Sequence, residues 1–228
     1  MKTIALIALL AACGTTESSS LLTTGIAADM SAVTTGDGTT RVTAELFNGS
    51  PDQLIFVDLQ PGDELVADVG GQSMTLAKTQ LVTIISYDAT FATGDQGDEF
   101  TVDFQRMVDD GAPASTVTLP APFTIDPVAA SSSRAAALTI TYAPSGTSDP
   151  VGWQASGDCI EVATGAAASD SGSITIPAGM LTANSGSTSC MVTVSLTRER
   201  AGTLDPHFGK GGEIQGQQVR TAMTTSTP

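Results

Sequence analysis

The sequence is poor in the residues that most catalytic and metal sites use. It has one histidine and three cysteines among 228 residues, and aromatic residues make up only 4% of it. A zinc site usually takes four cysteine or histidine ligands, and nucleophilic catalysis needs a base beside the nucleophile. Aromatic side chains that could stack on a bound sugar are also few. We therefore expect a protein without enzymatic activity.

Positive charge is also scarce. Nine Lys and Arg residues stand against 24 Asp and Glu, so the formal net charge is −15. Proteins that bind nucleic acid neutralise its phosphates with basic patches, so this balance argues against such a partner. Residues 29–126 hold 16 acidic and three basic residues, whereas residues 127–228 hold seven and five. The excess negative charge therefore lies mainly in the first half of the chain.

Hydroxyl side chains are abundant instead. The chain has 33 Thr and 22 Ser, together with 23 Gly and 11 Pro, and this composition favours short strands and turns. The segment Arg41–Phe47 alternates apolar and polar residues directly after the turn sequence Gly36–Gly38. It is expected to pair with Ile26–Val33 as a β-hairpin.

The same period of two recurs along the chain. Further strands are predicted at Leu54–Leu59, Glu64–Val69, Ser73–Lys78, Leu81–Phe91, Glu99–Arg106, Ser115–Leu119, Ala137–Tyr142, Val151–Gln154, Cys159–Val162, Gly172–Ile176, Cys190–Arg198 and Glu213–Met223. A proline-rich segment, residues 120–127, interrupts the pattern and predicts a boundary. The expected fold is all-β, with two tandem antiparallel immunoglobulin-like sandwiches over residues 24–126 and 127–228.

The first residues are predicted to form an export signal. Met1-Lys2 is basic, and the apolar run Ile4–Leu10 is too short to span a bilayer, which takes about 20 residues. Such a run is typical of a signal peptide. The sequence Leu10-Ala11-Ala12-Cys13 that follows resembles the lipobox of bacterial lipoproteins.

The lipobox resemblance implies a lipid anchor. Residues 1–12 would be removed, and Cys13 would carry a thioether-linked diacylglycerol and an N-acyl chain, with palmitate as a suitable label. Several acyl chains hold a protein stably at a membrane. Gly14 in place of Asp implies the outer membrane, on either its periplasmic or its surface face. Residues 13–23 are small and polar, which predicts a flexible tether.

Cys159 and Cys190 remain as an even pair. Disulfides form and persist in exported proteins, so a bond between them is predicted. Two free buried thiols or a metal site are the alternatives, although a two-cysteine zinc site would still need ligands that the single His207 cannot supply.

The second half resembles an immunoglobulin-like arrangement, with a strand at Ala137–Tyr142 followed by Trp153 and the two cysteines. Trp153 precedes both cysteines, whereas in antibody domains the Trp lies between them. Three sequence segments of the mature chain are similar to segments of uncharacterised two-sandwich lipoproteins of Gram-negative bacteria. They are Gln60–Leu65, Val117–Ile125 and Ser173–Gly179. This resemblance implies location and fold and no catalytic residue.

Four local features could carry chemistry. Asp170-Ser171-Gly172 matches the aspartic-protease signature, but the enzyme needs two such loops and the chain has one, so a turn is expected. His207 is interpreted as an incidental loop residue, and Trp153 as a core residue. Asp95, Asp98, Glu99 and Asp103 surround a glycine-containing turn and are weak candidates for calcium ligands. A solvated acidic rim is the commoner explanation.

Together these features predict a lipid-anchored cell-envelope protein that acts as a non-enzymatic structural or interaction module. Its partners would be the membrane, through the anchor, and an unknown envelope protein or glycan. The alternative is a calcium- or carbohydrate-binding module of the envelope.

Overall fold

The computed structural model describes residues 14–166, 169–184 and 188–228 and consists of β-strands with three short 3-10 turns. The first half contains β1 (Gly14–Glu17), β2 (Ile26–Thr34), β3 (Thr40–Asn48), β4 (Ile55–Asp58), β5 (Glu64–Val69), β6 (Gln72–Thr75), β7 (Ala77–Leu81), β8 (Ile84–Phe91), β9 (Glu99–Gln105) and β10 (Ala112–Thr118). The turns are η1 (Ser18–Ser20), η2 (Thr23–Gly25) and η3 (Pro51–Gln53).

The second half contains β11 (Thr124–Ile125), β12 (Ser131–Ser133), β13 (Leu138–Ala143), β14 (Val151–Gly157), β15 (Ile160–Ala166), β16 (Ser173–Ile176), β17 (Cys190–Ala201) and β18 (Glu213–Thr227). The all-β prediction is confirmed. Among the described residues, no helical segment has the length and apolar character needed to cross a membrane.

The predicted first hairpin is present. β2 and β3 pair antiparallel from Ile26 opposite Asn48 to Val33 opposite Arg41. Gly36 and Gly38 in the connecting turn both have positive φ, which an L side chain rarely adopts. Every second residue on each strand is buried, so the alternation in the sequence marks the face that packs on the core.

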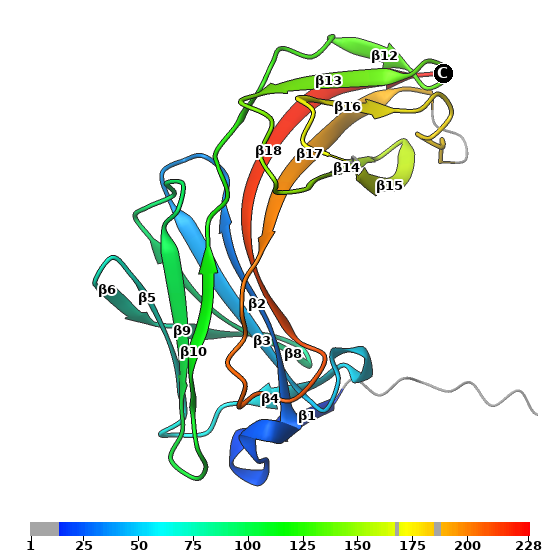
Figure 1. Ribbon diagram of the computed structural model, residues 1–228. Helices are drawn as coiled ribbons and strands as arrows, with labels where there is room; N and C mark the ends of the chain where they lie inside the picture. Colours follow the sequence, from blue (N-terminus) through cyan, green and yellow to red (C-terminus); the bar gives the residue numbers. More distant parts are fainter. Residues whose placement is uncertain (1–13, 167–168, 185–187) are drawn as a thin grey trace, which may run out of the picture.

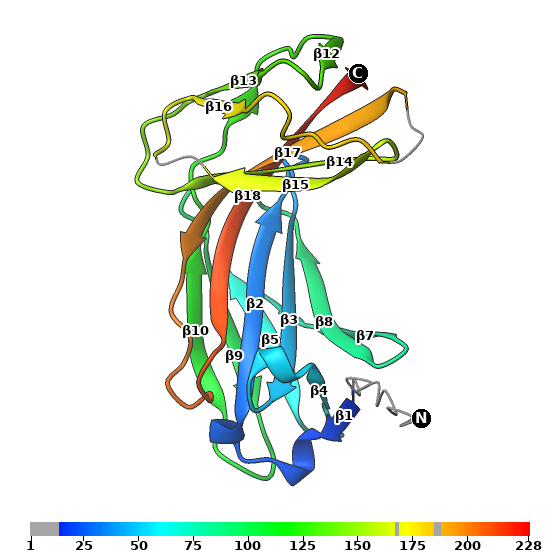
Figure 2. The same cartoon turned by 90° about the vertical axis from the view of Figure 1, so that its right-hand side faces the viewer.

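The strands form three sheets in a sandwich-like arrangement. The largest sheet has 11 strands, and its main path runs β1-β4-β3-β2-β18-β17-β14-β15. A sheet of β10, β9, β5 and β6 and another of β11, β13 and β16 lie on one side of it (Figure 1). The opposite side of the large sheet is turned toward the viewer in Figure 2, and none of the sheets formed by the described residues covers it.

Two hydrophobic clusters fill the space between these layers. The first contains Phe47, Phe91, Phe100 and Phe104, and the second is built around Phe123 and Trp153. The placement of Trp153 confirms its interpretation as a core residue. Phe208 and Ile214, late in the sequence, also belong to the first cluster.

The last strand connects the two clusters. β18 pairs in parallel with β2 through residues 213–218 and antiparallel with β17 through residues 215–226. Parallel pairing also joins β1 to β4 and β12 to β18, so the sheet is mixed and departs from the purely antiparallel expectation. The departure arises because β18 is long enough to pass from one cluster to the other, which no local pattern in the sequence indicates.

The segment expected to be a flexible tether is instead attached to the body. Gly14–Glu17 pair with Ile55–Asp58, and Ser18 and Thr23 are buried. The guanidinium of Arg106 donates to the carbonyls of Ser18 at 2.6 Å and Leu21 at 3.0 Å. Small polar residues suggest flexibility by composition, but here they satisfy the donors of a buried arginine.

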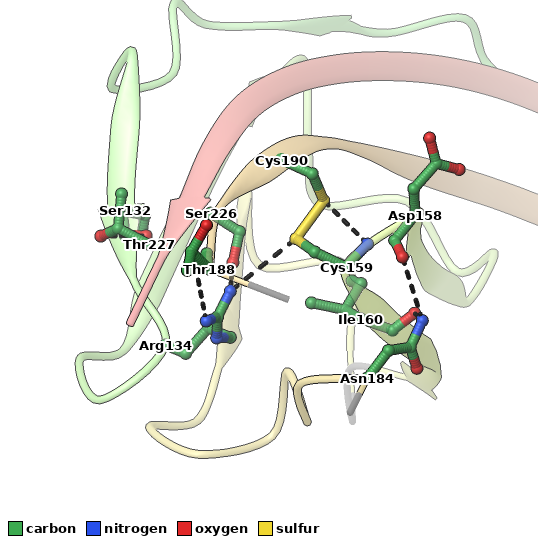
Figure 3. The surroundings of a disulfide bond; sticks show 10 residues. All are labelled: Ser132, Arg134, Asp158, Cys159, Ile160, Asn184, Thr188, Cys190, Ser226 and Thr227. Atoms are coloured by element: carbon green, nitrogen blue, oxygen red, sulfur yellow. Dashed lines mark hydrogen bonds between the residues drawn. A yellow bond between two sulfur atoms is a disulfide. The ribbon is translucent and has the colours of Figure 1, made fainter. Parts of the chain in front are cut away.

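The predicted disulfide between Cys159 and Cys190 is present and ties the β14–β15 turn to the start of β17 (Figure 3). Arg134 lies beside it and donates to the carbonyl of Thr188 at 2.8 Å and to the hydroxyl of Ser226 at 3.3 Å. The bond therefore belongs to a wider set of contacts that gathers the end of β18 and the start of β17.

Candidate functional site: the open face of the large sheet

The exposed side of the large sheet is accessible for recognition. We call it the open face and define it by the outward-pointing residues of β2, β3, β14, β17 and β18. They are Asp29, Ser31, Val33, Arg41, Thr43, Glu45, Gly152, Gln154, Ser156, Met191, Thr193, Ser195, Thr197, Glu199, Glu213, Gln215, Gln217, Val219, Thr221, Met223 and Thr225. All of these are partly or fully exposed, and most alternate with buried neighbours; neighbours such as Arg200, Arg220 and Ala222 are themselves partly exposed.

Cross-strand register makes the open face continuous over both halves. Gln154, Ser195 and Thr221 stand opposite one another on β14, β17 and β18. Farther along β18, Gln217 stands opposite Val33 of β2. Residues opposite one another on adjacent strands lie close enough for their side chains to contact one ligand together. The described part of this face carries no aromatic side chain.

On the buried side of β17 and β18, a set of side chains connects the two halves of the chain. We call this set of contacts the junction. The fully buried Arg198 donates to the carbonyls of Ala121 and Pro144, each at 2.7 Å. Opposite it on β18, Gln218 donates to the carbonyl of Pro120 at 3.2 Å. Proline-rich backbone carries carbonyls that no strand partner satisfies, and these side chains supply the missing donors.

Charge pairing completes this junction. Nη2 of Arg198 lies 3.0 Å from Oδ2 of the buried Asp170, and the guanidinium lies over the rings of Phe123 and Tyr142. Burial works against ionisation of Asp170, but hydrogen bonds from Thr147 and Tyr142 and the charge of Arg198 lower its pKa below the usual value. The open face is thus backed by a paired, hydrogen-bonded junction.

Acidic side chains form one row at the end of the open face that β2 and β3 build with β18. Glu213, Asp29 and Glu45 stand opposite one another on β18, β2 and β3. Partial burial, and then the negative charge of Glu213, raise the pKa of Asp29. Partial burial and the charge of Asp29 raise the pKa of Glu45. Their negative charges repel one another in the folded protein.

We expect Glu45→Gln to raise the thermal midpoint at pH 7. Because the pKa of Glu45 is raised on folding, the folded state holds its proton more tightly than the unfolded state does. The carboxylate then costs stability above its folded pKa, and this cost disappears as the pH falls below the unfolded value. The gain should vanish at pH 3. Thermal melts at both pH values measure it.

Asp88→Asn is the matched control for this prediction. Asp88 also lies on the sheet, but it pairs with Arg41 at 3.0 Å. Its replacement should lower the midpoint slightly or leave it unchanged at pH 7. An equal rise in both variants would show that mutual repulsion in the Glu213, Asp29 and Glu45 row is not the cause.

Two shallow depressions lie on this side of the sheet. One, of about 430 Å³, is lined by Val33, Thr35, Asp37, Thr39, Arg41, Thr43 and Thr90. The other, of about 260 Å³, is lined by the acidic row together with Met30, Ser31, Thr43 and Gln215. Both hollows are open, and most of the residues that line them are polar or charged.

The four weak calcium candidates are not gathered into one site. The Asp98 carboxylate accepts hydrogen bonds from the hydroxyl of Thr93 and the backbone N–H of Asp95, and Asp103 accepts one from Gln105. Asp103 lies four residues beyond Glu99 on β9, which corresponds to about 13 Å along a strand. Within residues 14–166, 169–184 and 188–228, no three His, Cys, Asp or Glu side chains are grouped to hold a metal ion.

The remaining predicted positions differ in outcome. Cys13 lies outside the described residues, so its lipidation stays a prediction. Asp170 of the Asp-Ser-Gly sequence is buried and paired with Arg198, as part of a structural junction. His207 is not isolated, because its Nδ1 lies 2.7 Å from Oδ1 of Asp205. Burial of Asp205 opposes ionisation, but hydrogen bonds from His207 and Ala114 lower its pKa.

His207 and Asp205 do not complete a nucleophilic triad. The nearby Ser115 hydroxyl accepts a hydrogen bond from the backbone N–H of Asp205 and makes none to the imidazole among the described residues. In a triad, the imidazole must lie between the hydroxyl and the carboxylate. The pair therefore serves to fix the loop between β17 and β18.

No protein-family model matches the sequence, and no curated protein matches it significantly. Among solved structures, similarity is found to a biofilm-associated protein BSP domain (14% identity, TM-score 0.24) over 87% of this chain and 29% of that one. A Bacteroides ovatus mixed-linkage glucan utilization protein in complex with a heptasaccharide gives 14% identity and TM-score 0.24, over 83% and 52%.

The Yersinia pseudotuberculosis adhesin InvE gives 13% identity and TM-score 0.22, over 87% of this chain and 58% of that one. The chain thus spans less than two thirds of the length of each of these structures. At these scores the similarities give no information on the activity of this chain, and its own geometry is the basis for assigning a function.

Proposed function

We propose that this protein is a lipid-anchored module of the bacterial cell envelope that binds a protein partner through the open face and catalyses no reaction. The observation that carries the proposal is the continuity of the open face across both halves of the chain. A surface of this extent, with hydroxyl, amide and charged side chains in register, is suited to many simultaneous polar contacts.

Residue chemistry favours a protein over a sugar as the partner. Sugar-binding surfaces commonly stack aromatic rings on the ligand, and the described open face offers none. Serine, threonine and glutamine side chains can donate and accept hydrogen bonds and so match the mixed surface of a folded protein. The acidic row with Asp29 would favour basic side chains at that end of the partner.

Attachment at Cys13 is the second part of the proposal and rests on the lipobox sequence Leu10-Ala11-Ala12-Cys13. We expect the protein to incorporate labelled palmitate and to fractionate with membranes, and Cys13→Ala to abolish incorporation. Equal labelling of the variant and the parent, or a fully soluble parent, would contradict the anchor.

Site-specific photo-crosslinking in intact cells tests the open face. A photoreactive amino acid at Thr221, on the exposed part of β18, should capture a discrete envelope protein. The same replacement at Thr139 is the matched control, because Thr139 is an exposed threonine on β13 in the layer behind the large sheet. Capture from Thr139 alone, or capture from both positions equally, would contradict recognition by the open face.

A further inference from the structure

The chain enters the fold at one end of the molecule and is fixed there. Gly14, the first described residue, pairs with Ile55 on β4. Arg106 holds the next turn through the carbonyls of Ser18 and Leu21 and the hydroxyl of Thr23. Because successive Cα atoms are only 3.8 Å apart, a lipid attached to the residue before Gly14 would hold this end of the body directly at a bilayer.

Exposed apolar side chains gather at the same end. Leu22 is 66% exposed, and in the loop between β9 and β10 Met107 is 77% and Val108 60% exposed. The Arg106 contacts bring this loop beside the segment that contains Leu22, and both reach the lower end of the molecule in Figure 1. Leu54, 45% exposed, immediately precedes the residue that pairs with Gly14.

The β7–β8 hairpin adds a second apolar point on the side where the chain enters (Figure 2). Leu81 closes β7 opposite Ile84, and Val82, which follows in the turn, is 83% exposed. An apolar hairpin tip exposed to this degree gains nothing from the core of the protein. Apolar groups at loop tips gain free energy when they enter a membrane interface.

Backbone conformation gives an independent indication. In the described residues, the non-glycine positions with positive φ are Leu54 at 51° and Val82 at 59°. Glycine or asparagine suits this conformation, and a β-branched residue such as Val is unfavourable there. Both positions thus hold an exposed apolar side chain at a cost to the local backbone. Leu54 adopts this conformation at the end of η3 and Val82 in the β7–β8 turn, and strained positions of this kind cluster at functional sites.

We infer that this end of the protein, together with the tip of the β7–β8 hairpin that projects beside it, rests in the lipid interface, with Leu22, Leu54, Val82, Met107 and Val108 as contact points. The inference rests on the proposed anchor and adds the orientation of the body relative to the membrane. Asp109 and Asp110 follow Val108, and Asp109 is already bound to the backbone N–H of Thr23. These acidic groups favour zwitterionic lipid, since an anionic surface would repel them.

The test uses the full lipidated protein, purified from membranes and reconstituted into phosphatidylcholine and phosphatidylethanolamine vesicles. A polarity-sensitive fluorophore is attached to Val108→Cys or Val82→Cys, while Cys159 and Cys190 stay bonded. Val162→Cys is the matched control: Val162 is 63% exposed, close to Val108, but lies on β15 at the opposite end (Figure 2).

The fluorophore at residues 108 and 82 is expected to shift to shorter wavelength in vesicles and to be quenched by nitroxide-bearing lipids. The control at residue 162 should show neither effect. If none of the three positions shows a shift while the protein still floats with the vesicles, the body stands away from the bilayer; if all three shift, this end has no special contact with lipid. In either case the inference is wrong although the anchor holds. Failure to float would contradict the anchor itself. A shift at residue 108 that depends on protein concentration and not on the presence of lipid would show that a second copy of the protein covers this end. That result would overturn the inference.

Discussion

Replacing Arg198 with methionine is expected to lower the free energy of unfolding by about 3–5 kcal/mol, because the change leaves the Asp170 carboxylate buried without its charged partner. The substitution also removes the donors that satisfy the carbonyls of Ala121 and Pro144. Methionine fills part of the same volume, so cavity formation contributes little. Urea denaturation followed by circular dichroism measures the effect.

Arg41→Met is the control for this prediction. Arg41 pairs with Asp88 at 3.0 Å, but its side chain is 59% exposed, so the loss should stay within about 1 kcal/mol. The double variant Arg198→Met with Asp170→Asn should be less destabilised than the sum of its single variants, since the buried charge is then removed. A cost for Arg198→Met no larger than that for Arg41→Met would contradict the role assigned to the buried pair.

Replacing both Cys159 and Cys190 with alanine is expected to cost roughly 3–4 kcal/mol, on the chain-entropy account for a bond that spans 31 residues. The thermal midpoint should fall by about 10 °C for a body of this size. Loss of the bond frees the start of β17 from the β14–β15 turn in the unfolded state, where the constraint matters most.

A reductant distinguishes the bond from the packing of its sulfur atoms. It should lower the midpoint of the parent protein toward that of the Cys159→Ala and Cys190→Ala double variant and leave the variant unchanged. A parent whose two thiols have become free to alkylation, with an unaltered midpoint, would contradict a stabilising bond.

The sequence predicts strands well where the local pattern is strong. β5 occupies Glu64–Val69 as expected, and the hairpin of β2 and β3 follows from alternation and from Gly36 and Gly38. Prediction from the sequence fails where contacts between residues distant in the chain determine the structure. The predicted strand from Leu81 to Phe91 is interrupted at Val82, where the chain turns with positive φ. No propensity favours a valine at that position.

The candidate site was predictable only in part. Alternation in Cys190–Arg198 and Glu213–Met223 marks one polar face on each strand, but not that the two faces join those of β2 and β3. A charged residue such as Arg198 is normally expected at the surface. Its burial depends on Asp170, 28 residues away, and on backbone carbonyls whose positions only the fold determines.

The placement of β18 has a consequence for biosynthesis. A ribosome delivers the chain from its amino end, so β2 is made long before the strand that lies beside it, and Phe208 and Ile214 are missing from the first core until translation is almost complete. The nascent protein therefore carries an unfinished sheet edge and uncovered apolar side chains for most of its synthesis. We expect it to depend on a holding chaperone until its final strand is available.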